Sequence, residues 1–335
     1  MNTMHSCWIR SSCPALPFAL LAFGVMACVP VNPQTDNEIT NIVTVGVGAA
    51  EEQPDLAIGD AARRVRNTAE SVKRYDELRL QGNSRGMIAM RTTIARTVDE
   101  NFDDFRDMAL DGEKYLHRNM AVKCLGFANE RRGDAREVLI EIASKPEEKV
   151  FLIANAARGL GLLRDPDTPL GPVIALMGSG DPTIRTSAAD ALKEILIVKK
   201  TPRDLTPQYL TAIDRCVTML YDKHNRYGRR AAVYALANMR HPTNMDHLLA
   251  ALGDDDEQVQ IGGLRGLQLL GDQRAIEGLL EYLGKGPTSA ASTWAVMALK
   301  AIALQAGLAK DPGEMIDLGD SPRKWDEFFR GARMR

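Results

Sequence analysis

The histidines and the acidic residues are the first candidates for chemistry, because their side chains transfer protons and bind metal ions. After residue 27 the histidines are His117, His224, His241 and His247. His241 and His247 lie six positions apart across a proline turn, which suits a zinc site poorly. The acidic run 254–257 lacks the glycine-bearing, twelve-residue spacing of a calcium loop. We therefore predict structural roles for these residues and no bound metal.

Short catalytic motifs are missing from the sequence. It contains no HExxH, CxxC, nucleophile-elbow or Walker motif. The triplet Gly46-Val47-Gly48 has the glycines of a phosphate loop, but no Gly-Lys-Ser/Thr follows it, so we interpret it as linker. We predict that the chain is not an enzyme and uses no cofactor.

The first 28 residues have the plan of a secretion signal. Arg10 and the amino terminus supply positive charge, and residues 15–27 form a mostly apolar segment too short to span a bilayer. The segment ends in Val25-Met26-Ala27-Cys28, which resembles the bacterial lipobox. The resemblance implies cleavage before Cys28 and lipid attachment to Cys28. An ordinary cleaved signal and a buried N-terminal segment are the alternatives.

The same residues predict a location. Lipid on Cys28 would anchor the chain to a membrane of the bacterial cell envelope, since each buried methylene contributes about 0.8 kcal/mol. Val29 follows the cysteine, where an aspartate would resemble an inner-membrane retention signal. The periplasmic face of the outer membrane is therefore favoured, with the cell surface as the alternative. Residues 28–54 are predicted to be a flexible tether.

A repeated helical unit organises the rest of the chain. A leucine recurs at spacings of 35, 32, 44, 31 and 32 residues, at Leu125, Leu160, Leu192, Leu236, Leu267 and Leu299. Small residues stand four and one positions before each anchor leucine, on the same face of a helix. A second apolar run at helical spacing follows each copy. The pattern predicts an all-α solenoid of about six stacked helical hairpins.

The unit resembles the HEAT-repeat family, in particular its short bacterial form related to bilin lyases. The family pattern places an apolar residue and arginine before paired alanines and Ala-Leu-Gly. This chain has Ile184-Arg185 before Ala188-Ala189 and Ala191-Leu192, and Arg229 before Ala231-Ala232 and Ala235-Leu236. The resemblance covers roughly residues 113–333 and implies a solenoid, but it says almost nothing about activity. We assign residues 113–335 to the repeats and their C-terminal cap.

Both flanks of the repeats are predicted to be capping structures. In residues 55–112, one amphipathic helix is predicted over 56–80 and a second apolar pattern from Met87 to Met108. We interpret this region as an N-terminal cap, with a partner-binding helix as the alternative. Trp325, Phe328 and Phe329 are predicted to cover the last repeat.

Helix-start residues and cysteines give further expectations. Asp181 before Pro182 is predicted to cap a first helix, Asp165 before Pro166 to cap a second helix, and the acidic run 254–257 to start another. Cys124 and Cys216 fall in different repeats, separated by two helix layers of about 10 Å each, whereas a disulfide needs Cα atoms within about 7 Å. We predict two buried free thiols.

The long 44-residue spacing contains a basic insertion at 198–207, and inserted loops of solenoids often carry function. The candidate edge for an acidic partner comprises Lys199, Lys200, Arg203, Arg226, Arg229 and Arg230. The alternative is a solvated loop.

Composition bounds the function. The net charge is −2, without the basic excess of nucleic-acid binders, so no nucleic-acid partner is expected. We predict a membrane-anchored scaffold that binds an unknown envelope protein through the curved face lined by the second helices. The rivals are a lyase-like enzyme or cofactor-handling protein, which the predicted export disfavours, and a nucleic-acid binder resembling HEAT-like glycosylases.

Overall fold

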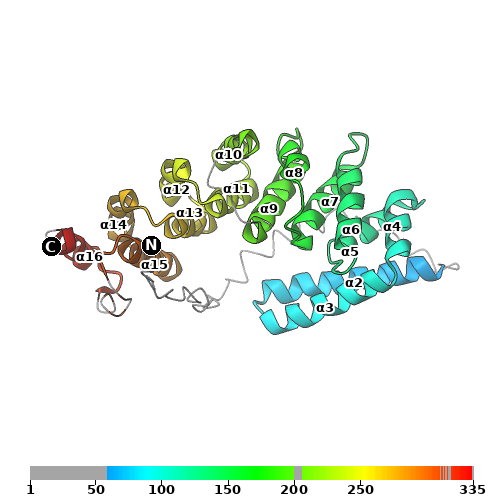
Figure 1. The fold of residues 1–335 in the computed structure, drawn as a ribbon, viewed down its shortest axis with the longest axis horizontal. Helices are drawn as coiled ribbons and strands as arrows, with labels where there is room; N and C mark the ends of the chain where they lie inside the picture. Colours follow the sequence, from blue (N-terminus) through cyan, green and yellow to red (C-terminus); the bar gives the residue numbers. More distant parts are fainter. Residues whose placement is uncertain are drawn as a thin grey trace, which may run out of the picture.

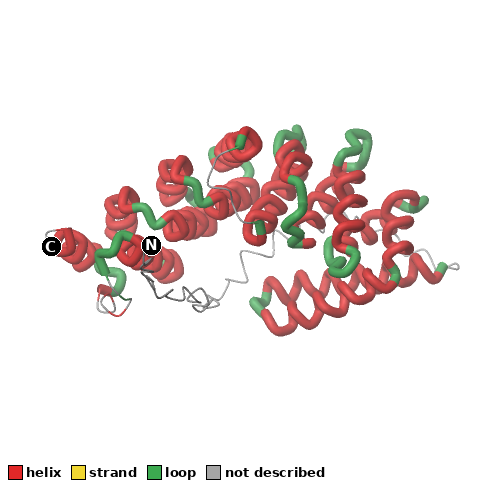
Figure 2. Tube along the Cα trace, viewed as in Figure 1, coloured by secondary structure: helices red, strands yellow, loops and turns green. Residues whose placement is uncertain are grey.

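The protein is all-α in the part that the structure describes. The computed structural model describes residues 59–199, 206–309, 311, 313, 315 and 318–333, and within these ranges it contains helices and turns but no strand. Figures 1 and 2 show the helices stacked side by side into an arch. The predicted all-α solenoid is confirmed. The predicted signal, the tether and Cys28 lie outside the described residues.

Six hairpins form the arch within the described ranges. Their first helices are α5 (Tyr115–Leu125), α7 (Val150–Leu163), α9 (Pro182–Val198), α11 (Arg226–Met239), α13 (Glu257–Leu270) and α15 (Ser289–Gln305). Their second helices are α6 (Arg132–Ala143), α8 (Leu170–Leu176), α10 (Pro207–Leu220), α12 (Met245–Ala250), α14 (Ile276–Gly284) and α16 (Pro322–Arg333). The six anchor leucines all lie in first helices and are fully buried, as the period predicts.

Small residues let successive first helices approach closely. A β-carbon at Gly161 of α7 would lie 2.7 Å from the Cα of Ala191 in α9. A β-carbon at Gly126, just after α5, would lie 2.7 Å from the Cα of Gly159 in α7. Backbone therefore meets backbone at these positions, and no side chain fits between them. The small residues predicted around the anchor leucines set the spacing of this row.

The first helices line the inner side of the arch, and the second helices lie along its outer side (Figure 1). Our expectation of a curved face lined by second helices is therefore wrong. The neighbouring first helices pack directly on one another, from α5 and α7 through to α13 and α15. The inner face is consequently one continuous row of first helices.

The N-terminal region contains three helices, not two. They are α2 (Asp60–Leu80), α3 (Ser84–Glu100) and α4 (Phe102–Asp111), and the second predicted pattern breaks at Asn101, whose φ of −125° is not helical. The apolar period runs across the break, because Val98 and Phe102 are both buried. Helix α4 packs on α5 and α6, whereas α2 and α3 lie lengthwise along the inner side of the arch (Figure 1).

Helix-start predictions are confirmed for two helices and wrong for one. Asp181 accepts hydrogen bonds from the backbone nitrogens of Thr183 (2.7 Å) and Ile184 (3.3 Å) at the start of α9. Asp256 starts α13 in the same way. Helix α8 begins after Pro169 without a side-chain cap. Asp165 instead pairs with Arg136 of α6, at 2.6 Å, because its loop folds back over the preceding repeat.

Helix α16 carries the aromatic cluster that was predicted to cover the last repeat. Trp325 of α16 is fully buried, and its Nε1 donates a hydrogen bond to the Gly319 carbonyl at 2.9 Å. The Trp325 and Phe329 rings stack, with centroids 5.8 Å apart. Helix α16 packs against α14 and closes the outer row.

Cys124 of α5 and Cys216 of α10 are both buried free thiols, as predicted. Burial raises the pKa of each thiol, so neither forms the reactive thiolate at neutral pH. The two cysteines therefore act as small core residues.

We predict that Gly161→Ala destabilises the protein by about 1–3 kcal/mol, because the added methyl group forces α7 and α9 apart. The matched control is Gly133→Ala in α6, where a β-carbon meets nothing within 4 Å. That change should stabilise by up to about 1 kcal/mol through reduced chain entropy. Urea unfolding followed by circular dichroism at 222 nm measures both. Equal effects of the two substitutions would refute the close-packing interpretation.

Candidate partner-binding surface

The six cations of the predicted basic edge do not form one surface. Lys200 and Arg203 lie outside the described residues. Lys199 follows the C-terminus of α9, whereas Arg226 begins α11. Successive first helices run parallel. Arg229 in the first turn of α11 pairs with Asp254 just before α13, and Arg164 at the end of α7 pairs with Glu194 near the end of α9. Lys199 and Arg226 consequently lie at opposite edges of the row.

Lys199 forms its hydrogen bonds within the repeat array. Its Nζ donates hydrogen bonds to the backbone carbonyls of Pro166 (2.9 Å) and Thr168 (3.2 Å), in the loop that joins α7 to α8. The side chain thus stabilises carbonyls that no helix satisfies.

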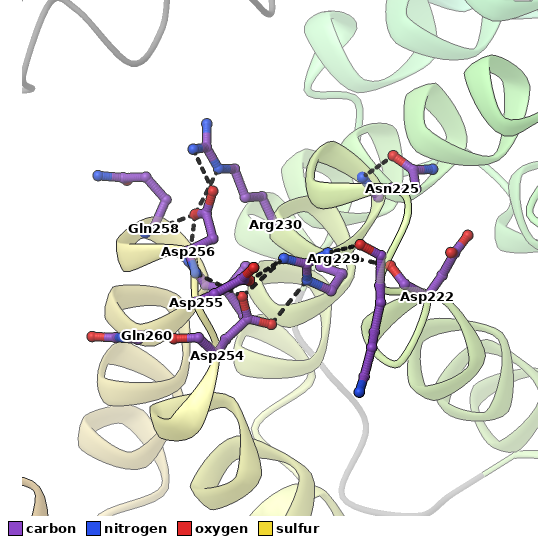
Figure 3. A network of polar contacts seen from close by, with 12 residues as sticks. Asp222, Asn225, Arg229, Arg230, Asp254, Asp255, Asp256, Gln258 and Gln260 are labelled. Atoms are coloured by element: carbon purple, nitrogen blue, oxygen red, sulfur yellow. Dashed lines mark hydrogen bonds and ion pairs between the residues drawn. The ribbon is translucent and has the colours of Figure 1, made fainter.

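Arg229 is buried in a polar network between two loops (Figure 3), and its side chain is 5 % exposed. Its guanidinium forms ion pairs with Asp254 (2.9 Å) and Asp255 (2.6 Å) in the loop before α13. It also donates hydrogen bonds to the carbonyls of Asp222 (3.3 Å) and Lys223 (2.9 Å) in the loop before α11. Burial alone would lower the pKa of Arg229, but hydrogen bonds with Asp254 and the neighbouring carboxylates raise it. The arginine therefore stays charged and joins the two loops.

Arg230 pairs with the same acidic run. Its Nε and Nη2 donate to the carboxylate of Asp256 at 2.8 and 2.6 Å, and Asp256 accepts the Gln258 and Val259 backbone nitrogens as the cap of α13. Assigning Arg229 and Arg230 to a basic docking edge is therefore wrong, because both are buried and neutralised inside the fold. Of the predicted cations within the described ranges, only Arg226 is an exposed side chain.

Residues at the position of Arg229, seven residues before the anchor leucine, make similar contacts with loops in other repeats. Arg118 pairs with Glu148 at 2.5 Å. Arg185 donates to the Ser179 carbonyl at 2.9 Å, and Gln260 donates to the Asp254 carbonyl at 2.7 Å. The arginine of the repeat pattern thus links the loops that join successive hairpins. The sequence carries a signal for this role of the arginine, because an acidic residue stands about one repeat further along the chain.

The inner face carries a second row of residues, two positions before each anchor leucine, which comprises Lys123, Arg158, Asp190, Tyr234, Arg265 and Met297. In the first two repeats these are Lys123 and Arg158, and α2 covers them. Arg158 pairs with Asp76 of α2 at 2.6 Å. Burial and then the charge of Arg158 lower the pKa of Lys123, which Asp76 partly offsets. This interface fixes α2 to the row of first helices.

The same row continues in repeats four and five beyond α2 and α3. Tyr234 and Arg265 occupy the corresponding positions, with the Arg265 guanidinium 5.9 Å from the centre of the Tyr234 ring. Exposed Arg240 ends α11, and half-buried Leu269 lies near the end of α13. We call Tyr234, Arg240, Arg265 and Leu269 the inner strip. It is the candidate partner-binding surface, and none of its residues was among the predicted site residues.

Within the described ranges, no group of three or more His, Cys, Asp or Glu side chains is arranged to hold a metal ion. None of the described helices is both long enough and apolar enough to cross a membrane.

We predict that Arg229→Met destabilises the protein by about 3–5 kcal/mol, because it leaves the mostly buried carboxylate of Asp254 and the carbonyls of Asp222 and Lys223 without their buried cation. The matched control is Arg323→Met, whose 88 % exposed side chain pairs with Glu327 on the surface of α16. It should cost less than about 1 kcal/mol. Urea midpoints measure both, and a small effect at Arg229 would show that the loops do not depend on the network.

Comparison with known proteins supports the repeat assignment. Residues 213–300 match the family described as HEAT repeats. No curated protein sequence matches the chain. An engineered protein of known structure is 20% identical, with a TM-score of 0.48, over 61% of this chain and 97% of that one. YibA from Escherichia coli is 16% identical, with a TM-score of 0.48, over 84% of this chain and 100% of that one.

A third solved structure is the complex of CpcE and CpcF of phycocyanin lyase from a Nostoc species. It is 17% identical, with a TM-score of 0.40, and the similarity covers 84% of this chain and 98% of that chain. These similarities concern the fold alone. Residues 213–300, which run from α10 to α15 of the solenoid, therefore match HEAT repeats, and the hairpins before them have the same helix order.

Proposed function

We propose that this protein is a lipoprotein of the bacterial cell envelope that binds another envelope protein through its HEAT-repeat surface. The observation that carries the proposal is the Val25-Met26-Ala27-Cys28 sequence, placed ahead of a proline-containing tether and a helical solenoid. A lipid on Cys28 would hold the solenoid at a membrane while the tether lets it reach a partner. Val29 favours the outer membrane.

Binding of a protein is the function that the surface supports. A stable interface covers about 800 Å² on each partner, which is more than a single repeat offers. The inner face extends over several repeats, since its first helices pack in one continuous row. On this row Tyr234 and Arg265 belong to residue types that are enriched at protein interfaces. We expect many side chains, and no single pocket, to contribute.

The test is a crosslinking pull-down from native membranes, comparing wild type with Cys28→Ala. Wild type should fractionate with membranes and recover a defined envelope protein, and Cys28→Ala should lose both properties because it cannot be lipidated. Cys13→Ala is the matched control: it removes a cysteine within the signal and should behave as wild type.

A soluble, cytoplasmic wild-type protein would contradict the envelope location. Membrane association of Cys28→Ala equal to that of wild type would contradict the lipid anchor. Wild type that fractionates with membranes but recovers no partner would contradict the scaffold function.

A further inference from the structure

The N-terminal hairpin shows how the inner face holds a helix. Helix α2 buries Val65, Val72 and Tyr75, and it packs against α5. Next to this apolar stripe, the Asp76 carboxylate meets Arg158 of α7 at 2.6 Å, with both side chains mostly buried. The inner face thus accepts a helix that combines apolar residues with a carboxylate facing Arg158.

Repeats four and five present the same kind of surface without such a helix. Arg265 of α13 stands two positions before its anchor leucine, as Arg158 does in α7. Figure 1 shows α2 and α3 running beneath the α5 end of the arch, and no described helix covers α11 and α13 from the inner side. The face that binds α2 therefore continues along the arch toward the inner strip.

Comparison of the second and fourth repeats shows that Arg240 lacks the carboxylate partner that Arg164 has. Arg164 and Arg240 both end a first helix with a left-handed backbone, at φ 48° and 49°. Arg164 pairs at 3.1 Å with Glu194, two positions after the next anchor leucine. Leu269 occupies that place in the fifth repeat, so Arg240 has no carboxylate there. Across the described ranges, neither Arg240 nor Arg265 has an ion-pair partner.

We propose that the inner strip binds a helix of the partner protein whose apolar residues lie beside carboxylates. Leu269 and Tyr234 contribute apolar and aromatic contact area, and Arg240 and Arg265 supply the cations that its carboxylates would meet. The binding mode is that of α2 on the first two repeats. The inference rests on the proposed protein-binding function and specifies the chemistry of its partner.

The experiment measures fluorescence anisotropy of a labelled probe on the detergent-solubilised full chain. The probe is an 18-residue amphipathic peptide with leucines along one face and glutamates flanking them, and a second peptide carries glutamine in place of each glutamate. The glutamate peptide should bind at least about tenfold more tightly at low salt, and the difference should shrink as salt is raised.

The site is tested by the double variant Arg240→Asp/Arg265→Glu, because aspartate tolerates the left-handed backbone at position 240. It should bind the glutamate peptide at least about tenfold more weakly than wild type. The matched control is Lys285→Glu just after the outer helix α14, where an exposed ion pair with Glu281 is lost, and its affinity should stay within about twofold. Circular dichroism confirms folding, and Arg265→Gln replaces the double variant if that variant does not fold.

Equal binding of the two peptides would overturn the proposal, as would equal weakening by Lys285→Glu. Variant-sensitive binding of a single-stranded oligonucleotide or of anionic vesicles, without binding of the glutamate peptide, would also overturn it. In native membranes, recovery of the same partner by wild type and by the double variant would refute the inner strip while leaving the scaffold function intact. Recovery of no partner by wild type would refute the scaffold function itself.

Discussion

The close contact between successive first helices is the constraint on which the rest of the structure depends. Gly126, Gly159 and Gly161 bring backbone against backbone along this row, whereas the second helices bury larger side chains such as Leu139 of α6 and Met245 of α12. A row spaced by glycine and alanine is shorter than one spaced by leucine and methionine. The stack therefore bends toward the first helices, which puts them on the inside of the arch.

Charged residues then divide into two roles according to their place on the first helix. Those seven positions before the anchor leucine, such as Arg229, point to the loops and hold neighbouring hairpins together. Those two positions before it, such as Arg158 and Arg265, lie on the inner face. Helix α2 neutralises this inner row only in the first repeats, so the repeat geometry leaves a surface with cations beyond it.

The sequence predicted the features that depend on local periodicity and missed those that depend on contacts between repeats. The anchor leucines and small residues predicted the hairpins, because one helical face repeats at a nearly constant interval. The break at Asn101 was missed because Val98 and Phe102 keep the apolar period across it. Arg229 and Arg230 resembled a solvated basic run, since their partners lie 25 and 26 residues later. The inner strip was missed because no pattern in α2 indicates which face of the solenoid it covers.

The central claim is that the inner face of the first helices binds the partner protein. Photo-crosslinking in living cells tests this claim directly. A benzoyl-phenylalanine would replace Arg265 on the inner row in one variant and Lys285 on the outer row in another. The account predicts a crosslinked envelope protein from position 265 and none from position 285. A crosslink from position 285 alone would contradict it and would place binding on the second helices.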